Sequence, residues 1–402
     1  MKTTIEDILT IALMTPMGDP VRDPANCKMG LPTILWGTPG IGKSFRIEHV
    51  SMTLGLPCEI ILPSTRQPED ASGAAMPDGS GGVIFVSLLP GVKRLKQNKQ
   101  GVLVLDELSC AKPSVQAAFL GVILDRRVGD EKLPPGIRIL AAANDAEEAA
   151  GGWELEPPMA NRLCHIDVPP PTDDDWVAWL MKDEAPVISP LESAEMQLAA
   201  GWDSAWAWAR SMRAGYGKVN RDDKVLLDIP AVGKPERGKG WPSPRSWTMA
   251  LRAMATCKIF GKAEDVMHTF VCGCIGSGIG TEFITWMRNA DLPTAEEALK
   301  NGWKPDTQRL DRSVAVYSSV GLHMAQLEKT NRDSAVRLAP KAWKLLHEGW
   351  EAGLGDIVIV PAHQLINANL GRTSSQEAKK IASPLLEQMA NSGYHKILRK
   401  VA

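Results

Sequence analysis

Residues 37–44 read Gly-Thr-Pro-Gly-Ile-Gly-Lys-Ser, which brings glycines, a lysine and a hydroxyl side chain into one short loop. Glycine lets the backbone take a positive φ, and the N–H groups of such a loop and of the following helix attract an anion. Lys43 can neutralise the β- and γ-phosphates of a nucleotide, and Ser44 offers a hydroxyl to Mg²⁺. We therefore predict a site for ATP and Mg²⁺ here. The residues assigned to nucleotide binding are Gly37, Thr38, Pro39, Gly40, Ile41, Gly42, Lys43 and Ser44.

The segments on either side of this loop have the patterns that phosphate binding requires. Residues 33–36 form a short apolar run, which predicts a buried parallel strand. After the loop, Ile47, Val50 and Leu54 fall on one face of a predicted helix, and Gly55 is a suitable end for it. A strand, a loop and a helix in this order favour phosphate binding over the alternative, a glycine-rich turn without a ligand.

Two adjacent acids follow another apolar run, residues 102–105. Ligands of open parallel sheets bind at the carboxyl ends of the strands, so Asp106 and Glu107 would lie at that edge. Neighbouring residues of a strand point to opposite sides, so the two acids can have different roles. We assign Asp106 to the Mg²⁺ shell opposite Ser44, and Glu107 to deprotonation of the attacking water. The alternative is a solvated Asp-Glu turn.

A third apolar run, residues 137–143, ends at Asn144. This asparagine would share the edge of the sheet with the acids, where its amide could place the attacking water. A turn-forming asparagine is the competing interpretation, because Asn is common in turns.

Taken in order, these residues resemble an AAA+ ATPase of the MoxR branch over about residues 5–290. The resemblance rests on these segments: Gly37 to Ser44, Leu105-Asp106-Glu107-Leu108, Asn144, Ala160-Asn161-Arg162-Leu163 and Ser243-Pro244-Arg245-Ser246. It implies that Arg162 is an arginine finger, which is donated across a subunit boundary to the γ-phosphate of the neighbour. It also implies that Arg245 is the sensor-2 arginine of its own protomer. A guanidinium is always charged and forks onto phosphate oxygens, so both roles are chemically sound.

Some residues depart from the family pattern or compete for these roles. Leu163 stands where many members have Phe after the finger arginine, and Asp145 stands where many have Pro. Arg126 and Arg127 are rival phosphate contacts, or alternatively residues of a subunit interface. Arg162 and Arg245 could themselves be solvated surface residues.

The resemblance also implies an architecture. We expect an α/β fold in which residues 1–168 form a three-layer core around a parallel sheet, with strands near 33–36, 58–62, 102–105, 137–143 and 165–168. An insert near residues 65–86 would be a β-hairpin that lines a ring pore, with its tip at residues 78–82; an ordinary surface loop is the alternative. Residues 169–290 would form a helical lid. Residues 291–402 would be a mostly helical extension, with one strand-like run at 357–360.

Function and partners follow from the same resemblance. It implies an ATP-dependent, chaperone-type remodeller of a protein client, which works as a homo-oligomeric ring, generally a hexamer, with a von Willebrand factor A-type partner. One alternative is a nucleic-acid motor or loader with the same core. The chain has 45 basic and 47 acidic residues and a net charge of −2, which gives no general attraction for nucleic acid. Another alternative is a slowly hydrolysing, nucleotide-gated scaffold.

Composition and local patterns set further limits. The seven cysteines lack paired spacing, which is typical of reduced thiols in a cytoplasmic protein. Cys272 and Cys274 are interpreted as part of a helix core rather than as metal ligands. The apolar stretch 4–14 is interrupted by acids, so we expect no membrane span, and Thr4 with Asp7 predicts a capping box.

Overall fold

The computed structural model describes residues 4–144, 153–181, 191–219, 223–290, 292–371 and 375–392. The chain divides into two compact units: residues 1–202 together with 226–282, and residues 203–225 together with 283–402. The divisions fall inside two helices, α8 (Leu191–Val219) and α11 (Ser277–Asn289), so both units contain part of each. The three-part division expected from the sequence stays a prediction.

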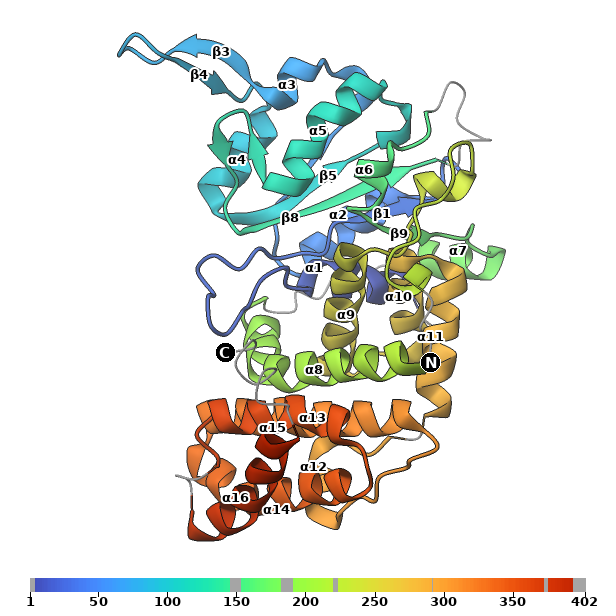
Figure 1. The fold of residues 1–402 in the computed structure, drawn as a ribbon. Helices are drawn as coiled ribbons and strands as arrows, with labels where there is room; N and C mark the ends of the chain where they lie inside the picture. The colour runs from blue at the N-terminus through green and yellow to red at the C-terminus, as the bar shows by residue number, and fades with distance from the viewer. Residues whose placement is uncertain are drawn as a thin grey trace. The chain divides into compact units, whose positions relative to one another are not determined.

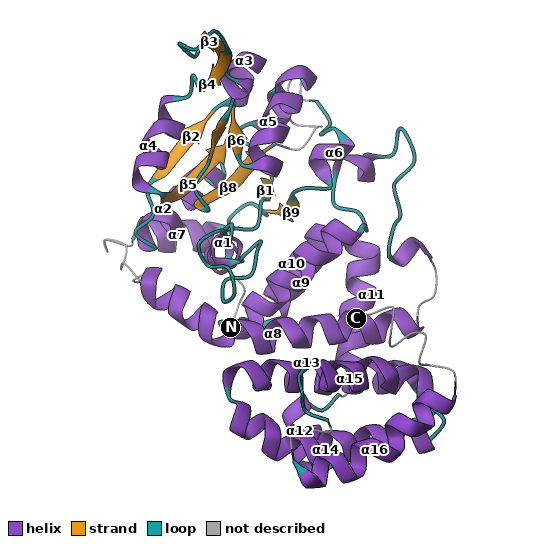
Figure 2. Ribbon diagram, turned by 60° about the vertical axis from the view of Figure 1, so that its left-hand side comes forward, coloured by secondary structure: helices purple, strands orange, loops and turns teal. Residues whose placement is uncertain are grey.

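The first unit is built around a five-stranded parallel sheet with strand order β2-β5-β8-β1-β9, drawn in orange in Figure 2. The strands are β1 (Thr33–Trp36), β2 (Cys58–Ile61), β5 (Gln100–Leu105), β8 (Gly136–Ala143) and β9 (Cys164–Asp167). The central strands β1, β5 and β8 are almost fully buried, as continuous apolar runs in a parallel sheet should be. The expected α/β fold and its strand positions are confirmed.

Alternating side chains of the central strands serve the two faces of the sheet. Leu103 and Leu105 of β5 pack in one apolar cluster with Phe119 of α5 (Pro113–Asp125). Val102 and Val104 are equally buried but point to the other face, because successive residues of a strand alternate. Figure 1 shows α5 on one side of the sheet and the N-terminal helices on the other. Those helices are α1 (Ile5–Met14) and α2 (Lys43–Thr53), and α4 (Pro90–Asn98) contacts β2 and β5.

The helix α1 begins at the N-cap Thr4, whose side chain bonds to Asp7, while a reciprocal capping box stays a prediction. The Oγ1 atom of Thr4 accepts the N–H of Asp7 at 3.2 Å and donates its own hydrogen to the Asp7 carboxylate at 3.0 Å. This exchange satisfies a backbone donor that the first turn of a helix would otherwise leave free.

The segment between β2 and β5 contains the expected hairpin. After α3 (Pro68–Ser72), β3 (Ala74–Pro77) pairs antiparallel with β4 (Val83–Val86), and Figure 1 shows the pair extending from the core. At the tip, the Asp78 carboxylate accepts the N–H groups of Ser80 and Gly82, each at 2.8 Å. The hairpin is confirmed, and its role at a ring pore stays a prediction.

The base of this hairpin is fastened to a second, shorter one, formed by β6 (Arg127–Val128) and β7 (Glu131–Lys132). The Phe85 N–H donates to the Asp130 carboxylate at 2.8 Å, and the Asp130 N–H donates to the Phe85 carbonyl at 2.9 Å. The two hairpins therefore share a hydrogen-bonded junction, and the chain continues from β7 into β8.

Four further helices of the first unit lie after the sheet strand β8 in the chain. They are α6 (Pro157–Ala160), α7 (Asp173–Leu180), α9 (Pro244–Ile259) and α10 (Glu264–Ile275). Helix α10 packs against α9 and β9, and it carries Cys272 and the buried Cys274, so the helix interpretation of these cysteines is confirmed. No helix within the described ranges combines the length and the apolar character needed to cross a membrane.

The second unit is helical. Besides its parts of α8 and α11, it contains α12 (Ala295–Asn301), α13 (Leu310–Thr330), α14 (Arg332–Glu351), α15 (Gly355–Asn367) and α16 (Gln376–Asn391). The strand-like interpretation of residues 357–360 is wrong, because they lie in α15. The buried residues Val358, Pro361, Ala362 and Leu365 have the spacing of one helix face, and packing of α15 on α13 outweighs the strand preference of β-branched residues.

Candidate functional site

The predicted phosphate loop leaves β1 at the carboxyl edge of the sheet and enters α2 at Lys43. Gly37 packs so closely that a Cβ would lie 2.6 Å from the Val168 carbonyl oxygen, so only glycine fits there. Gly40 and Gly42 have φ of 86° and 82° and face open space. Their backbone is therefore free of neighbouring side chains on that side, which suits a cradle for an anion.

Lys43 joins this loop to the end of β8. Its side chain is buried, and its ammonium group donates to the carbonyls of Gly37 at 2.7 Å and Thr38 at 2.9 Å, and to the side-chain oxygen of Asn144 at 2.9 Å. These three acceptors are uncharged oxygen atoms that hold the ammonium in place. The structure thus brings Asn144 to the loop, as the order of the strands predicts.

Ser44 and Asp106 also meet at this edge. The Ser44 hydroxyl donates to the Asp106 carboxylate at 2.6 Å, across 62 residues of sequence. A hydroxyl and a carboxylate supply the oxygen ligands that Mg²⁺ prefers, so the residues present fit this ion.

Glu107 has an unusual backbone conformation. Its φ of 52° and ψ of 39° are left-handed, which is uncommon for a residue with a side chain, and its N–H donates to the Asp106 carboxylate at 3.0 Å. The exposed side chain lies beside Ser64, whose hydroxyl is 3.4 Å from a carboxylate oxygen of Glu107. Ser64 belongs to the short helix (Pro63–Thr65) that follows β2, the strand next to β5. Sequence reasoning missed this residue, and its only signal was its place after a neighbouring strand.

The two predicted arginines lie near enough to each other for their charges to interact. Burial, and then the neighbouring charge of Arg245, lower the pKa of the Arg162 guanidinium. That guanidinium donates to the Pro158 carbonyl, and Arg245 is exposed at the first turn of α9. Within the described part of the chain neither side chain hydrogen-bonds to residues 37–44, so the assignments to the neighbouring and to the same protomer stay predictions.

Arg126 has a structural role. It is 3% exposed, and its guanidinium donates to the carbonyls of Ile137, Met29 and Gly30, the last two at 3.3 and 3.2 Å. The side chain is buried and its guanidinium hydrogen-bonds to buried carbonyls, so it is not accessible to a phosphate or to a neighbouring subunit. The suggestion that Arg126 makes such a contact is therefore wrong. Arg127 is exposed and remains available for such a contact.

A buried histidine links the base of the loop to the turn before Arg162. The Trp36 indole N–H donates to Nδ1 of His165 at 2.9 Å, so Nε2 carries the proton and donates to the Ala160 carbonyl at 2.9 Å. Burial, with a smaller contribution from the charge of Lys239, lowers the pKa of His165 to about 4. Nothing in the spacing of these residues indicated that they would meet.

Acid should weaken the fold through His165. In the unfolded chain this histidine titrates near pH 6.5, whereas in the folded chain its pKa is about 4, so the unfolded state binds the proton more tightly. The stability contribution is complete above pH 6.5 and declines as the pH falls towards 4, by about 3 kcal/mol. Nearby Asp167 acts in the opposite direction, by favouring the charged ring. Urea unfolding between pH 7 and 4 should show a shallower decline for His165→Gln than for the wild type, and equal slopes would contradict the assignment.

Comparisons with known proteins leave the function to be argued from these residues. No protein-family model matches the chain, and no curated protein matches it. Solved structures include similar chains, among them a protein from Cytophaga hutchinsonii described as a candidate ATPase. It is 15% identical, with a TM-score of 0.42, and the match covers 70% of this chain and 92% of that one.

Proposed function

We propose that the protein binds ATP and Mg²⁺ at residues 37–44 and hydrolyses the nucleotide, as an ATPase of the AAA+ type. One observation carries this proposal. The loop, Asp106, Glu107 and Asn144 come from three separate strand ends, and the bonds from Lys43 and Ser44 join them into one site. A lysine, a hydroxyl, two acids and an amide around a glycine-rich loop are the groups that phosphoryl transfer to water needs.

Each residue has a distinct part in the proposed reaction. Ser44 and Asp106 would hold Mg²⁺, whose charge offsets that of the phosphates. The Glu107 carboxylate accepts a proton from the attacking water as the water oxygen bonds to the γ-phosphorus, and the bond to the bridging oxygen breaks to release ADP. Asn144 orients the water, and Lys43 neutralises charge on the β- and γ-phosphates.

Loss of the Lys43 ammonium should weaken nucleotide binding strongly. A charge-assisted bond to phosphate contributes about 2 kcal/mol or more, so Lys43→Ala should bind ATP–Mg²⁺ at least about 30-fold more weakly in calorimetric titrations. Lys93→Ala is a suitable control, because Lys93 is an exposed lysine on α4. A wild-type protein that binds no ATP–Mg²⁺ would overturn the proposed function.

We further propose that the ATPase remodels a protein client as a homo-oligomeric ring, in the manner of MoxR-type proteins with a von Willebrand factor A-type partner. A hexamer is the ring size that the resemblance implies. The hairpin β3–β4 supports a contact with an unfolded chain, because Met76 and Ile84 pair across its strands and are 51% and 42% exposed. Exposed apolar pairs on a two-stranded projection have no core to join, and such surfaces favour contact with other apolar chains.

Replacement of the exposed apolar side chains of the hairpin by serine should reduce the stimulation of ATP turnover by a client. With casein as an unfolded-chain probe, we expect stimulated ATP turnover in the wild type, and at least about 5-fold less stimulation in Met76→Ser/Ile84→Ser, since each buried apolar contact contributes about 1 kcal/mol. Basal turnover should not change. Val21→Ser is the matched control, since Val21 is a 40% exposed apolar residue outside the hairpin. Full stimulation of the hairpin variant would reject this role.

Residues 93–99 contain four basic side chains, Lys93, Arg94, Lys96 and Lys99, but they give little support to the nucleic-acid alternative. Arg94 forms a bidentate ion pair with Glu59 at 2.6 and 2.7 Å, and Lys96 pairs with Glu131. Charges that are paired on the same surface attract a phosphate backbone less strongly.

A further inference from the structure

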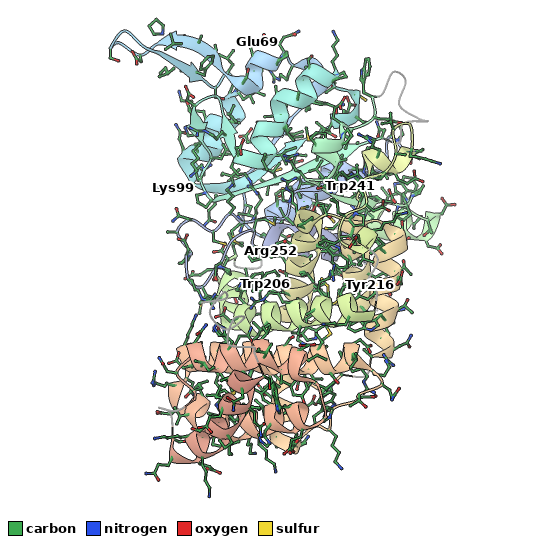
Figure 3. The ribbon with its side chains drawn as sticks, in the orientation of Figure 1. Glu69, Lys99, Trp206, Tyr216, Trp241 and Arg252 are labelled. Atoms are coloured by element: carbon green, nitrogen blue, oxygen red, sulfur yellow. The ribbon has the colours of Figure 1, made fainter. Side chains whose placement is uncertain are left out.

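One buried side chain joins the turn that carries Arg162 to the helix that carries Arg245. Asn161 is 4% exposed. Its amide nitrogen donates to the Trp241 carbonyl at 3.1 Å, and its amide oxygen accepts the Ser243 hydroxyl at 2.8 Å. Figure 3 labels Trp241, which lies in the segment just before α9. Both ends of the Asn161 amide are therefore used on the segment that leads into α9.

The bond to Ser243 also sets the start of α9. Ser243 is the N-cap residue: its oxygen accepts the Ser246 N–H at 3.1 Å, and its own N–H donates to the Ser246 hydroxyl at 2.9 Å. Because the Ser243 hydroxyl donates its hydrogen to Asn161, the same oxygen can accept the Ser246 N–H of the first helical turn. The next residues of the chain are Pro244 and Arg245, so the cap fixes the backbone from which Arg245 extends.

The histidine link holds the same turn at the preceding residue. Ala160 precedes Asn161 and accepts from His165, which in turn accepts from Trp36, the residue before the phosphate loop. A continuous hydrogen-bonded path thus runs from the base of the loop, through the turn before Arg162, to the cap of α9.

The two arginines require such a restraint. Arg245 lies near enough to lower the pKa of Arg162, so the like charges repel, and exposed Arg245 could relieve this by moving away. A buried amide that donates to one group and accepts from another loses more than one bond when it is replaced.

We propose that Asn161 is a positioning residue, which holds the cap of α9 against the turn that bears Arg162 and so fixes the backbone from which Arg245 reaches the γ-phosphate. This inference rests on the proposed ATPase function. Asn161 itself touches no substrate. Its replacement should therefore change the turnover number and leave nucleotide affinity nearly unchanged.

The test compares Asn161→Asp in two backgrounds. Aspartate keeps the shape and the acceptor but loses the N–H that Trp241 accepts. In the wild-type background kcat for ATP should fall about 10- to 100-fold, because small misplacements of catalytic groups cost that much, while the Kd for ATP–Mg²⁺ stays within about 2-fold. In the Arg245→Ala background the same substitution should lower kcat less than about 3-fold, since residues that act as a unit are not additive.

Controls separate positioning from folding. Thr256→Val removes a fully buried hydroxyl that donates to the Arg252 carbonyl at 3.0 Å on the same helix, and it should lower the Tm without changing kcat. If Asn161→Asp does not fold, Ser243→Gly is the milder variant, because glycine is tolerated at an N-cap and only the bond to Asn161 and the cap hydroxyl are lost.

Three outcomes are decisive. A large loss of kcat that disappears without Arg245 supports the proposal. A wild-type kcat in Asn161→Asp, or an equal loss in both backgrounds, overturns it while the ATPase function stands. Absence of hydrolysis by the wild-type protein instead overturns the ATPase function, which the Lys43 titration tests separately.

Discussion

Replacement of Glu107 by glutamine is expected to stop ATP turnover while ATP remains bound. Glutamine keeps the shape of the side chain and an oxygen for the Ser64 hydroxyl, but it cannot accept a proton from water. A general base contributes about 10²- to 10⁴-fold, so kcat should fall by at least about 100-fold. The Kd for ATP–Mg²⁺ should change little, because Lys43, Ser44 and Asp106 are untouched. Single-turnover hydrolysis and equilibrium binding are the two measurements.

A matched substitution is available on the same unit. Glu69 is an exposed acid on α3, labelled in Figure 3, and Glu69→Gln should retain wild-type turnover. Turnover of Glu107→Gln within about 3-fold of the wild type would remove Glu107 as the base. A wild-type protein that completes a single turnover but does not cycle would instead favour the nucleotide-gated scaffold.

Replacement of Arg162 should lower kcat at least as much as replacement of Glu107. Mixing of subunits with different substitutions should restore part of this activity. An arginine that meets the transferring phosphoryl group contributes about 10³- to 10⁵-fold, so Arg162→Ala should be nearly inactive. If Arg162 serves the neighbouring site, a mixture of Arg162→Ala with Glu107→Gln chains regains activity. In such a mixture some sites combine an intact Glu107 from one chain with an intact Arg162 from the next.

A second mixture is the control. Lys43→Ala and Glu107→Gln both damage the site of their own chain, so their mixture should stay inactive. An inactive mixture of Arg162→Ala with Glu107→Gln would mean that Arg162 acts within its own protomer. The same experiment with Arg245→Ala tests the sensor-2 assignment, which predicts no recovery.

The strands and the phosphate loop could be predicted because their signals are local. Four or more apolar residues followed by glycine or an acid identify a buried strand end, and parallel strands bring such ends to one edge. This is why Asp106 and Asn144 were expected beside Lys43 and Ser44. The wrong prediction of a strand at 357–360 also came from a local signal, because β-branched residues favour strands. The helical spacing of the buried residues of α15 becomes visible only when residues beyond this run are included.

The remaining contacts depend on partners far away in the sequence. Ser64 meets Glu107 across 43 residues, Trp36 meets His165 across 129, and Asn161 meets Ser243 across 82. No pattern of spacing encodes such pairs. The burial of Arg126 was equally invisible, because a lone arginine after a helix has the same appearance in sequence whether it faces solvent or three buried carbonyls.

The junction between the two hairpins does not depend on the side chains that the projecting hairpin β3–β4 would use to contact a target. On the side of β4 it uses only main-chain atoms of Phe85, whereas the Asp130 side provides the carboxylate. Side chains along the projecting hairpin can therefore differ between related proteins, so that each protein binds a different target. The hydrogen bonds between Phe85 and Asp130 would be kept. Asp130 is the position at which such divergence should be least tolerated, because its carboxylate carries the link towards β8 and the nucleotide edge.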